Sequence, residues 1–187
     1  LHEGDHSHYQ QMLEDAIAKI KSGETEANLD NDQWAPQINL GVSVLIPAVY
    51  VPDLDVRLGL YRRLSNLATK VELEGFAAEL IDRFGPLPKE VNTLMLIVRI
   101  KAMCRKAGIS KLDGGPKGAT LQFHNEKFAS PGGLVAFIED QRGLAKIRDN
   151  KIVVRRDWLR TSDKIKGAFT IAKDLAALVA VEAKRSG

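Results

Sequence analysis

Four residues in the stretch VELEGFAAELIDRFGPLP (71–88) have the types and spacing of a contact surface for a basic partner. If the stretch is helical, the face opposite its apolar stripe carries Glu72, Gly75, Glu79 and Asp82. Carboxylates accept charge-assisted hydrogen bonds from arginines, and glycine adds no bulk, so this face would be acidic and flat. Two of its residues break local rules. Gly75 costs about 1 kcal/mol relative to alanine in a helix interior, and Asp82 sits where the helix dipole disfavours an anion. Since such violations often mark function, a docking surface is the functional hypothesis for this face.

A solvated helix face is the plainer interpretation of the same residues. Glu79 would then pair with Arg83 four residues later, for a few tenths of a kcal/mol. Under the docking hypothesis the carboxylates steer a partner and fix its register, so they should matter little for stability.

A second candidate surface combines cations with an aromatic ring in VVRRDWLR (153–160). The candidate nucleic-acid contacts are Arg155, Arg156, Trp158 and Arg160. The alternative is a solvated strand end with Trp158 anchored in the core.

No constellation of residues indicates catalysis. GGPKGAT (114–120) lacks the residue order of a phosphate-binding loop, and a hairpin or a turn at the start of a strand explains it better. Cys104 lies in an apolar helical pattern without a neighbouring histidine, so we expect a buried, unactivated thiol, and His124 ends a strand. Metal-ligand types gather at one place outside the predicted fold: His2, Glu3, Asp5, His6 and His8. We therefore predict no enzyme, no metal site and no cofactor.

Composition is that of an ordinary soluble chain with enough apolar material for a core. The 187 residues are 44% hydrophobic and 27% charged, with a net charge of +3. One cysteine fits a reducing cytosol, so we expect a cytoplasmic location, and no apolar run is long enough to span a membrane. Because the chain opens without Met, we expect residues 1–8 to be a fragment end, a processing or expression remnant, or a disordered terminus.

Helices are predicted where apolar residues recur with a period near 3.6. The segments are 9–21, 55–68, the stretch after Thr69, 88–107, 130–140 and 162–185. Asp55 is expected to cap the second helix, and Thr69 with Glu72 forms a capping box for the third. Gly85 and Gly108 are expected to end helices. The stripe expected to face the core from the stretch after Thr69 is Leu73, Phe76, Ala77, Leu80, Ile81 and Phe84. The residues that trace the last helix along the sequence are Ile165, Phe169, Ala172, Leu175, Leu178, Val179 and Glu182.

Strands are predicted where apolar residues alternate. The segments are 37–47, 109–112, 119–123, 144–148 and 151–155, with RDNK (148–151) as a hairpin turn. Helices and strands do not alternate strictly, which favours an α+β fold: a three-helix segment, a small mainly antiparallel sheet and a long C-terminal helix. We expect one domain over residues 9–187, with a helical segment at 55–107 and an α/β segment at 109–187.

Three motifs in this order resemble those of a known family. LIPAVYVPD (45–53), RLGLYRRL (57–64) and ELIDRFGPLP (79–88) resemble the C-terminal domain of bacterial transcription-repair coupling factors, the Mfd proteins. The likeness covers roughly residues 9–185, more loosely beyond residue 92.

This resemblance implies a regulatory domain. Members of the family are DNA translocases that remove stalled RNA polymerase and recruit the repair protein UvrA, and their ATPase motor and polymerase-binding module lie upstream of this domain. The C-terminal domain packs on an N-terminal UvrB-like module of the same protein, masks the UvrA-binding surface and restrains the motor. The resemblance assigns contacts with arginines of that module to Glu79 and Asp82. We expect an autoinhibitory docking domain, with UvrA and RNA polymerase as indirect partners and DNA bound through the absent motor; the alternative is an accessory nucleic-acid-binding domain with a basic face.

Overall fold

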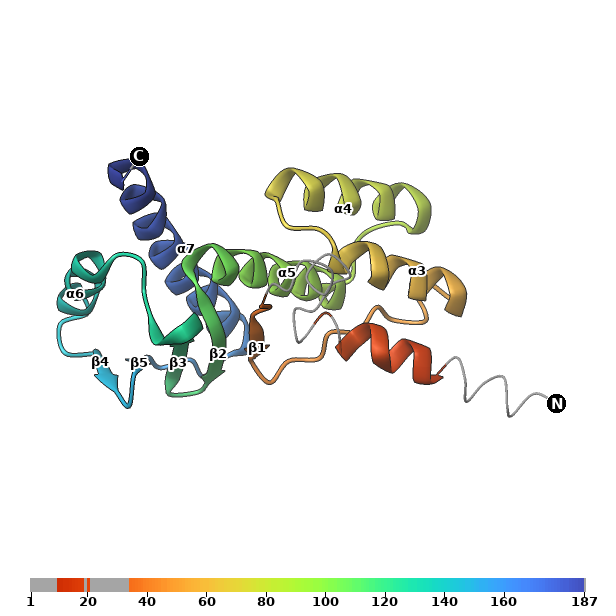
Figure 1. The fold of residues 1–187 in the computed structure, drawn as a ribbon. Helices are drawn as coiled ribbons and strands as arrows, with labels where there is room; N and C mark the ends of the chain where they lie inside the picture. The colour runs from red at the N-terminus through yellow and green to blue at the C-terminus, as the bar shows by residue number, and fades with distance from the viewer. Residues whose placement is uncertain (1–9, 19, 21–33, 187) are drawn as a thin grey trace. The chain divides into compact units, whose positions relative to one another are not determined.

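The structure is a computed structural model that describes residues 10–18, 20 and 34–186 (Figure 1). Residues 10–18 and residue 20 are helical, as predicted for 9–21, and Ala16 and Ile20 are buried. The labelled elements are β1 Gln37–Asn39, α3 Leu54–Ser65, α4 Lys70–Phe84, α5 Lys89–Ala107, β2 Ile109–Gly115, β3 Gly118–Phe123, the short 3₁₀ helix η1 His124–Glu126, α6 Pro131–Asp140, β4 Ala145–Arg148, β5 Lys151–Arg155 and α7 Thr161–Ser186. This order confirms the predicted α+β class. No helix in the described part of the chain is long and apolar enough to cross a membrane.

The chain forms two compact units. One combines the described residues before 34 with Ser43–Arg99, and the other combines Trp34–Val42 with the residues from Ile100 onward. The change between them along α5 falls after Arg99.

In the first unit, α3 holds the preceding extended segment by polar contacts. The hydroxyl oxygen of Tyr61 accepts a hydrogen bond from the backbone N–H of Ile46 at 2.5 Å. The Arg57 guanidinium donates to the carbonyl oxygens of Val51 and Pro52 at 2.7 and 3.0 Å. Both Tyr61 and Ile46 are buried, so these contacts fix the segment against the helix from within.

Two predicted elements had wrong boundaries. The strand expected at 37–47 ends at Asn39, because Gly41 turns the chain with a φ of +64°. Burial still alternates through Val44 and Ile46, since the segment stays extended without a neighbouring strand. The cap of α3 is Asp53, not Asp55: the Asp53 carboxylate accepts from the backbone N–H of Val56 at 3.0 Å, and Asp55 lies in the first turn. The helix also ends at Ser65, three residues before the expected 68.

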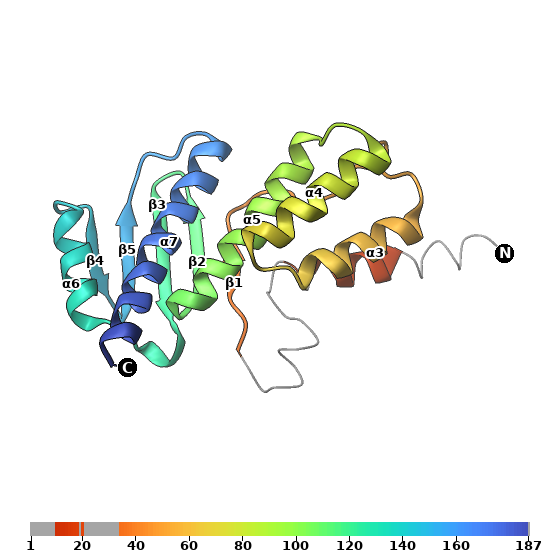
Figure 2. The same cartoon turned by 90° about the horizontal axis from the view of Figure 1, so that it is seen from above.

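The second unit is built on a five-stranded sheet with the order β1-β2-β3-β5-β4. β1 pairs with β2 in parallel, and the other pairings are antiparallel, as predicted. Figure 2 shows α6 and α7 over one face of this sheet, and in Figure 1 no described helix of the same unit lies over the other face.

The hairpins formed where the sequence placed them. Asp149 and Asn150, both with positive φ, connect β4 to β5, and Pro116-Lys117 connect β2 to β3. Thus 114–120 is a hairpin, as expected, although β2 extends to Gly115 rather than ending at 112.

Trp158 anchors α7 to the sheet. It is 7% exposed, and its ring fills the space where a side chain at Gly167 would stand, while the Leu40 side chain fills that space at Gly114. The buried residues of α7 are Ile165, Ala168, Ile171, Ala172, Leu175 and Ala176. Of the other residues that marked this helix in the sequence, Phe169, Leu178, Val179 and Glu182 are half-buried, because small alanines let the helix approach through its neighbouring face.

Candidate functional site

The first candidate surface lies on α4, whose N-terminus is held by the predicted capping box. The Thr69 hydroxyl accepts from the Glu72 N–H at 3.1 Å, while the Glu72 carboxylate accepts from the Thr69 N–H at 3.1 Å. The Thr69 N–H and, after it, the Thr69 hydroxyl, which donates to Glu72 Oε1 at 2.9 Å, hold the pKa of Glu72 below its ordinary value. Glu72 therefore caps its own helix, and its carboxylate already accepts hydrogen bonds there.

At its other end α4 stops at Gly85, as predicted, with a φ of +95°. The Tyr50 hydroxyl lies 2.8 Å from the Gly85 carbonyl oxygen and 3.2 Å from that of Leu80, so it binds the last turn to the extended segment. The Tyr50 and Phe84 rings pack at a centroid distance of 5.7 Å.

The inner stripe of α4 is narrower than the sequence predicted. Leu73, Phe76 and Leu80 are buried, whereas Ile81 is 48% exposed and Phe84 half-buried. The apolar residues of α4 extend further around the helix than the elements packed against it can cover. One edge of the candidate face is therefore apolar.

Glu79 is already engaged inside the unit. Arg63 of α3 donates to both of its carboxylate oxygens, at 2.6 and 2.9 Å, and Arg83 donates to Oε2 at 3.3 Å. The Arg63 guanidinium also lies 5.2 Å from the centroid of the Phe76 ring. The hydrogen bonds and charges of the two arginines, the Arg63 hydrogen bonds foremost, lower the pKa of Glu79 to about 2. The i+4 pair with Arg83 predicted by the plainer interpretation is present, but Arg63 is the stronger partner.

Asp82 differs from Glu79 in having no such partner. Its side chain is exposed, and within the described part of the chain it forms no ion pair or side-chain hydrogen bond. Nothing lies within 4 Å of a Cβ built at Gly75, so the surface beside it is open and flat. Of the three predicted carboxylates, only Asp82 is unengaged.

The second candidate set, at the end of β5, is dispersed by the fold. Arg156 donates to the Gln141 side-chain oxygen and to the Arg155 carbonyl oxygen, and Trp158 is buried against α7. Arg155 and Arg160 remain exposed. A buried ring cannot stack on a base, so the expected combination of cations and an aromatic ring does not form one surface.

Elsewhere the described residues bring together little chemistry. They contain no group of three His, Cys, Asp or Glu that could hold a metal. The metal-ligand types at positions 2–8 lie outside the described residues. Cys104 is buried, which raises the pKa of its thiol, and His124 stacks on Trp34 at 4.6 Å. A hollow of about 320 Å³ lies at the β2–β3 hairpin; its lining from Gly115 to Thr120, Val153 and Val154 offers Lys117 as its one charged side chain.

Sequence reasoning missed Arg63 as the partner of Glu79. Arg63 was visible in a basic run, but the pairing joins two helices across 16 residues, which no periodicity reveals. It also missed the sheet face opposite α6 and α7, since that face exists only once strand order is known.

The model of the TRCF domain family matches residues 40–134 of this chain. A transcription-repair-coupling factor from Rickettsia conorii is 43% identical over 146 residues, which are 78% of this chain and 13% of the relative. The protein of the same name from Escherichia coli strain K12 is 34% identical over 133 residues, 71% of this chain and 12% of the relative. The chain thus spans about an eighth of the length of these relatives.

A solved structure has the same fold. The crystal structure of the C-terminal domain of a transcription-repair coupling factor superposes with a TM-score of 0.64 at 19% identity, covering 79% of this chain and 96% of that one.

Proposed function

We infer a function for this chain from the fact that it belongs to the TRCF domain family. We propose that it is a non-catalytic regulatory domain of a transcription-coupled DNA repair translocase. In this proposal it docks on the N-terminal UvrB-like module of the same protein, masks the surface that binds UvrA and restrains the ATPase motor. RNA polymerase and DNA are then partners of the other modules.

One observation carries the docking proposal: Asp82 is an exposed and unengaged carboxylate in the last turn of a helix. That position opposes the helix dipole, so the charge gives nothing to α4 itself. An arginine of a partner would supply the missing counter-charge through charge-assisted hydrogen bonds. Gly75 leaves room for that arginine's long side chain to lie along the helix.

Glu79 has a secondary role in this proposal. A carboxylate offers about four lone-pair sites, and Arg63 and Arg83 already use three of those on Glu79. One site remains for a partner, whereas all those of Asp82 are open. Asp82 is therefore the main acceptor, and Glu72, which caps its own helix, only adds to the local negative field.

Calorimetric titration of the 187-residue chain into the separately purified UvrB-like module tests this proposal. At low salt, Asp82→Arg should weaken binding on the order of 10-fold or more, since it removes a charge-assisted bond and adds repulsion. The matched control is Asp174→Arg, which makes the same charge change at an exposed position of α7. Equal affinity of the Asp82 variant and the control would exclude α4 as the docking face.

The masking of UvrA needs its own readout. Wild-type chain bound to the UvrB-like module should reduce capture of UvrA by that module, and Asp82→Arg should restore capture. If the chain binds the module while UvrA capture is unchanged, docking survives and masking does not.

A further inference from the structure

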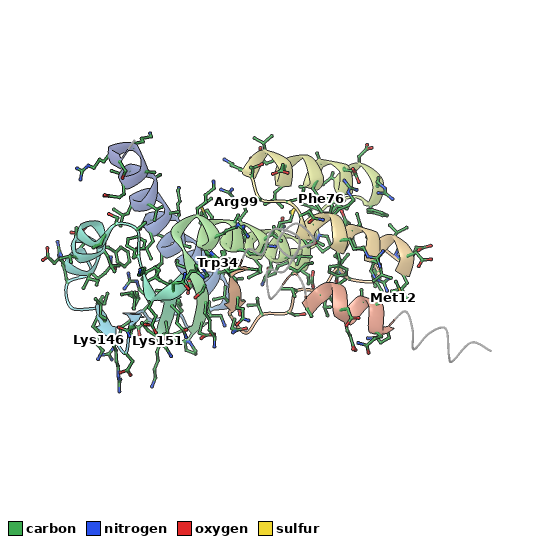
Figure 3. The ribbon with its side chains drawn as sticks, viewed as in Figure 1. Met12, Trp34, Phe76, Arg99, Lys146 and Lys151 are labelled. Carbon is green, nitrogen blue, oxygen red and sulfur yellow. The ribbon has the colours of Figure 1, made fainter. Side chains whose placement is uncertain are left out.

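The open face of the sheet carries a concentration of positive charge. Five cations project from it, from three of the five strands: Lys111, Lys146, Arg148, Lys151 and Arg155. We call this set the basic sheet face. Figure 3 shows two of its members, Lys146 and Lys151, on the side of the sheet away from α6 and α7.

Strand register places all five on one side. Residues paired across neighbouring strands share a face, and successive residues alternate. Ala119, Val154 and Ala145 are paired in one buried row, which therefore faces the helices. The rows one position to either side of it face away, and so does the row three positions from it. One joins Lys111, Gln122, Lys151 and Arg148, the next joins Asp113, Thr120, Val153 and Lys146, and the last pairs Gly118 with Arg155.

The charges on this face are not balanced within the unit. Asp113 is the acid in these rows, and it lies 3.7 Å from Lys111 and accepts from Asn39 at 2.8 Å. Among the described residues, Lys146, Arg148, Lys151 and Arg155 form no ion pair. The face therefore carries five positive charges against one negative charge.

Two features show that edge protection does not explain this pattern. Lysines on an edge strand discourage sheet-to-sheet aggregation, which accounts for Lys146 and Arg148 on β4. It does not account for Lys151, Arg155 and Lys111, which lie on interior strands. Arg148 and Lys151 also stand directly opposite each other, an arrangement of like charges that destabilises a strand pair.

The chemistry of the face selects the kind of partner. Protein interfaces are centred on buried apolar or aromatic anchors, and the only large apolar side chain in these rows is the half-buried Val153. Single-stranded nucleic acids are held by aromatic rings on which bases stack, and none of these rows contains an aromatic residue. What remains is a polyanion recognised by charge alone.

We propose that the basic sheet face binds the phosphate backbone of duplex DNA without sequence preference. Strand spacing puts Lys111 and Lys151 about 10 Å apart, and Lys151 and Arg155 lie about 13 Å apart along β5. Duplex DNA carries one charge per about 1.7 Å of its axis, so a patch of this size meets several phosphates at once. This binding uses neither Asp82 nor the UvrB-like module, so it stands or falls separately from the docking proposal.

Fluorescence anisotropy of the 187-residue chain with a labelled DNA duplex of about 30 base pairs tests the proposal. If all five cations meet phosphates, log affinity should fall against log salt with a slope of about −4.5, or about 500-fold between 50 and 200 mM salt. Replacing the interior-strand cations, by Lys111→Gln with Lys151→Gln and Arg155→Gln, should reduce the slope to about −1.8, or about 10-fold over that range.

A control with the same change in net charge isolates the face. Lys166→Gln, Lys173→Gln and Lys184→Gln remove three exposed cations from α7 and should leave the slope near that of the wild type. If circular dichroism shows that the triple sheet variant does not fold, the single variants Lys151→Gln and Arg155→Gln replace it, and each should reduce the slope by about 0.9.

Four results would overturn the inference: no binding at 50 mM salt, an unchanged slope in the sheet variants, an equal loss in the α7 control, or tighter binding to single-stranded oligo-dT than to the duplex.

Discussion

Replacing Tyr61 with phenylalanine tests how the segment before α3 is held. The hydroxyl oxygen of Tyr61 is the acceptor for the backbone N–H of Ile46, at 2.5 Å, and the two residues are 1% and 4% exposed. Phenylalanine keeps the ring and its packing, so no cavity forms. The change removes an acceptor and leaves a buried N–H without a partner or access to water.

The structure sets the size of the effect. An unsatisfied buried donor costs about 1–3 kcal/mol. In a chain of this length each kcal/mol corresponds to a fall in melting temperature of about 2–4 °C, so a loss near 2 kcal/mol gives about 4–8 °C. Tyr50→Phe is the matched comparison, because its hydroxyl is also a hydrogen-bonding group of the same unit but is only half-buried. It leaves carbonyl oxygens near water rather than a buried N–H, so about 1 kcal/mol is expected.

A local measurement is the sharper assay. Since the chain forms two compact units, a global melt can combine two transitions. Hydrogen exchange followed by NMR reports the Ile46 amide directly, and Tyr61→Phe should speed its exchange more than Tyr50→Phe does. If Ile46 exchanges at the wild-type rate, or if Tyr50→Phe is the more destabilising change, the assignment of this bond is refuted.

Three further predictions concern packing, charge and the thiol. Gly167→Ala would place a Cβ 2.4 Å from the Trp158 ring, so it should lower the stability of the fold by about 1–3 kcal/mol and shift tryptophan fluorescence. Gly75 has open space around it, so Gly75→Ala should instead stabilise α4 by about 0.5–1 kcal/mol in urea titrations. Because the pKa of Glu79 is lowered to about 2, its ion pairs should stabilise the fold above about pH 4.5, and this contribution should be lost as the pH falls toward 2. The difference in unfolding free energy between wild type and Glu79→Gln should therefore disappear over that pH interval. Burial should protect Cys104 from Ellman's reagent in the folded chain, with reaction at neutral pH only on unfolding; prompt reaction would contradict the buried position.

Local signals were enough to predict most of the elements. The capping box at Thr69, the terminator Gly85 and the Asp-Asn hairpin turn each depend on residues within four positions of one another, and all three formed. The prediction failed where two local signals competed. Asp53 and Asp55 both suit an N-cap, and only the path of the preceding segment decides between them. In the same way, alternating apolar residues at 37–47 predicted a strand, but a strand also needs a neighbour beyond Asn39.

The candidate surfaces depended on contacts that sequence does not contain. Periodicity placed Glu79 and Asp82 together on the outer face of α4 and gave no reason to separate them. The pairing of Glu79 with Arg63 comes from the packing of two helices, and it distinguishes a used carboxylate from an open one. Predicting the basic sheet face required the strand order as well. Lys111 and Lys151 are 40 positions apart in the sequence, and they lie on one patch because only β3 separates their strands.

The contacts of Glu79 also indicate how docking would remain reversible. A partner's arginine that approaches this carboxylate meets Arg63 and Arg83 as well, so the local charge there is positive rather than negative. To bind Glu79 fully it must displace an existing hydrogen bond, which exchanges one charge-assisted bond for another at little net gain. At Asp82 the same arginine gains a bond without losing one. Attraction is thus concentrated at a single exposed position, where charge pairs are modest and sensitive to salt. A regulatory contact that must be released benefits from such an arrangement, because small competing interactions suffice to shift its equilibrium.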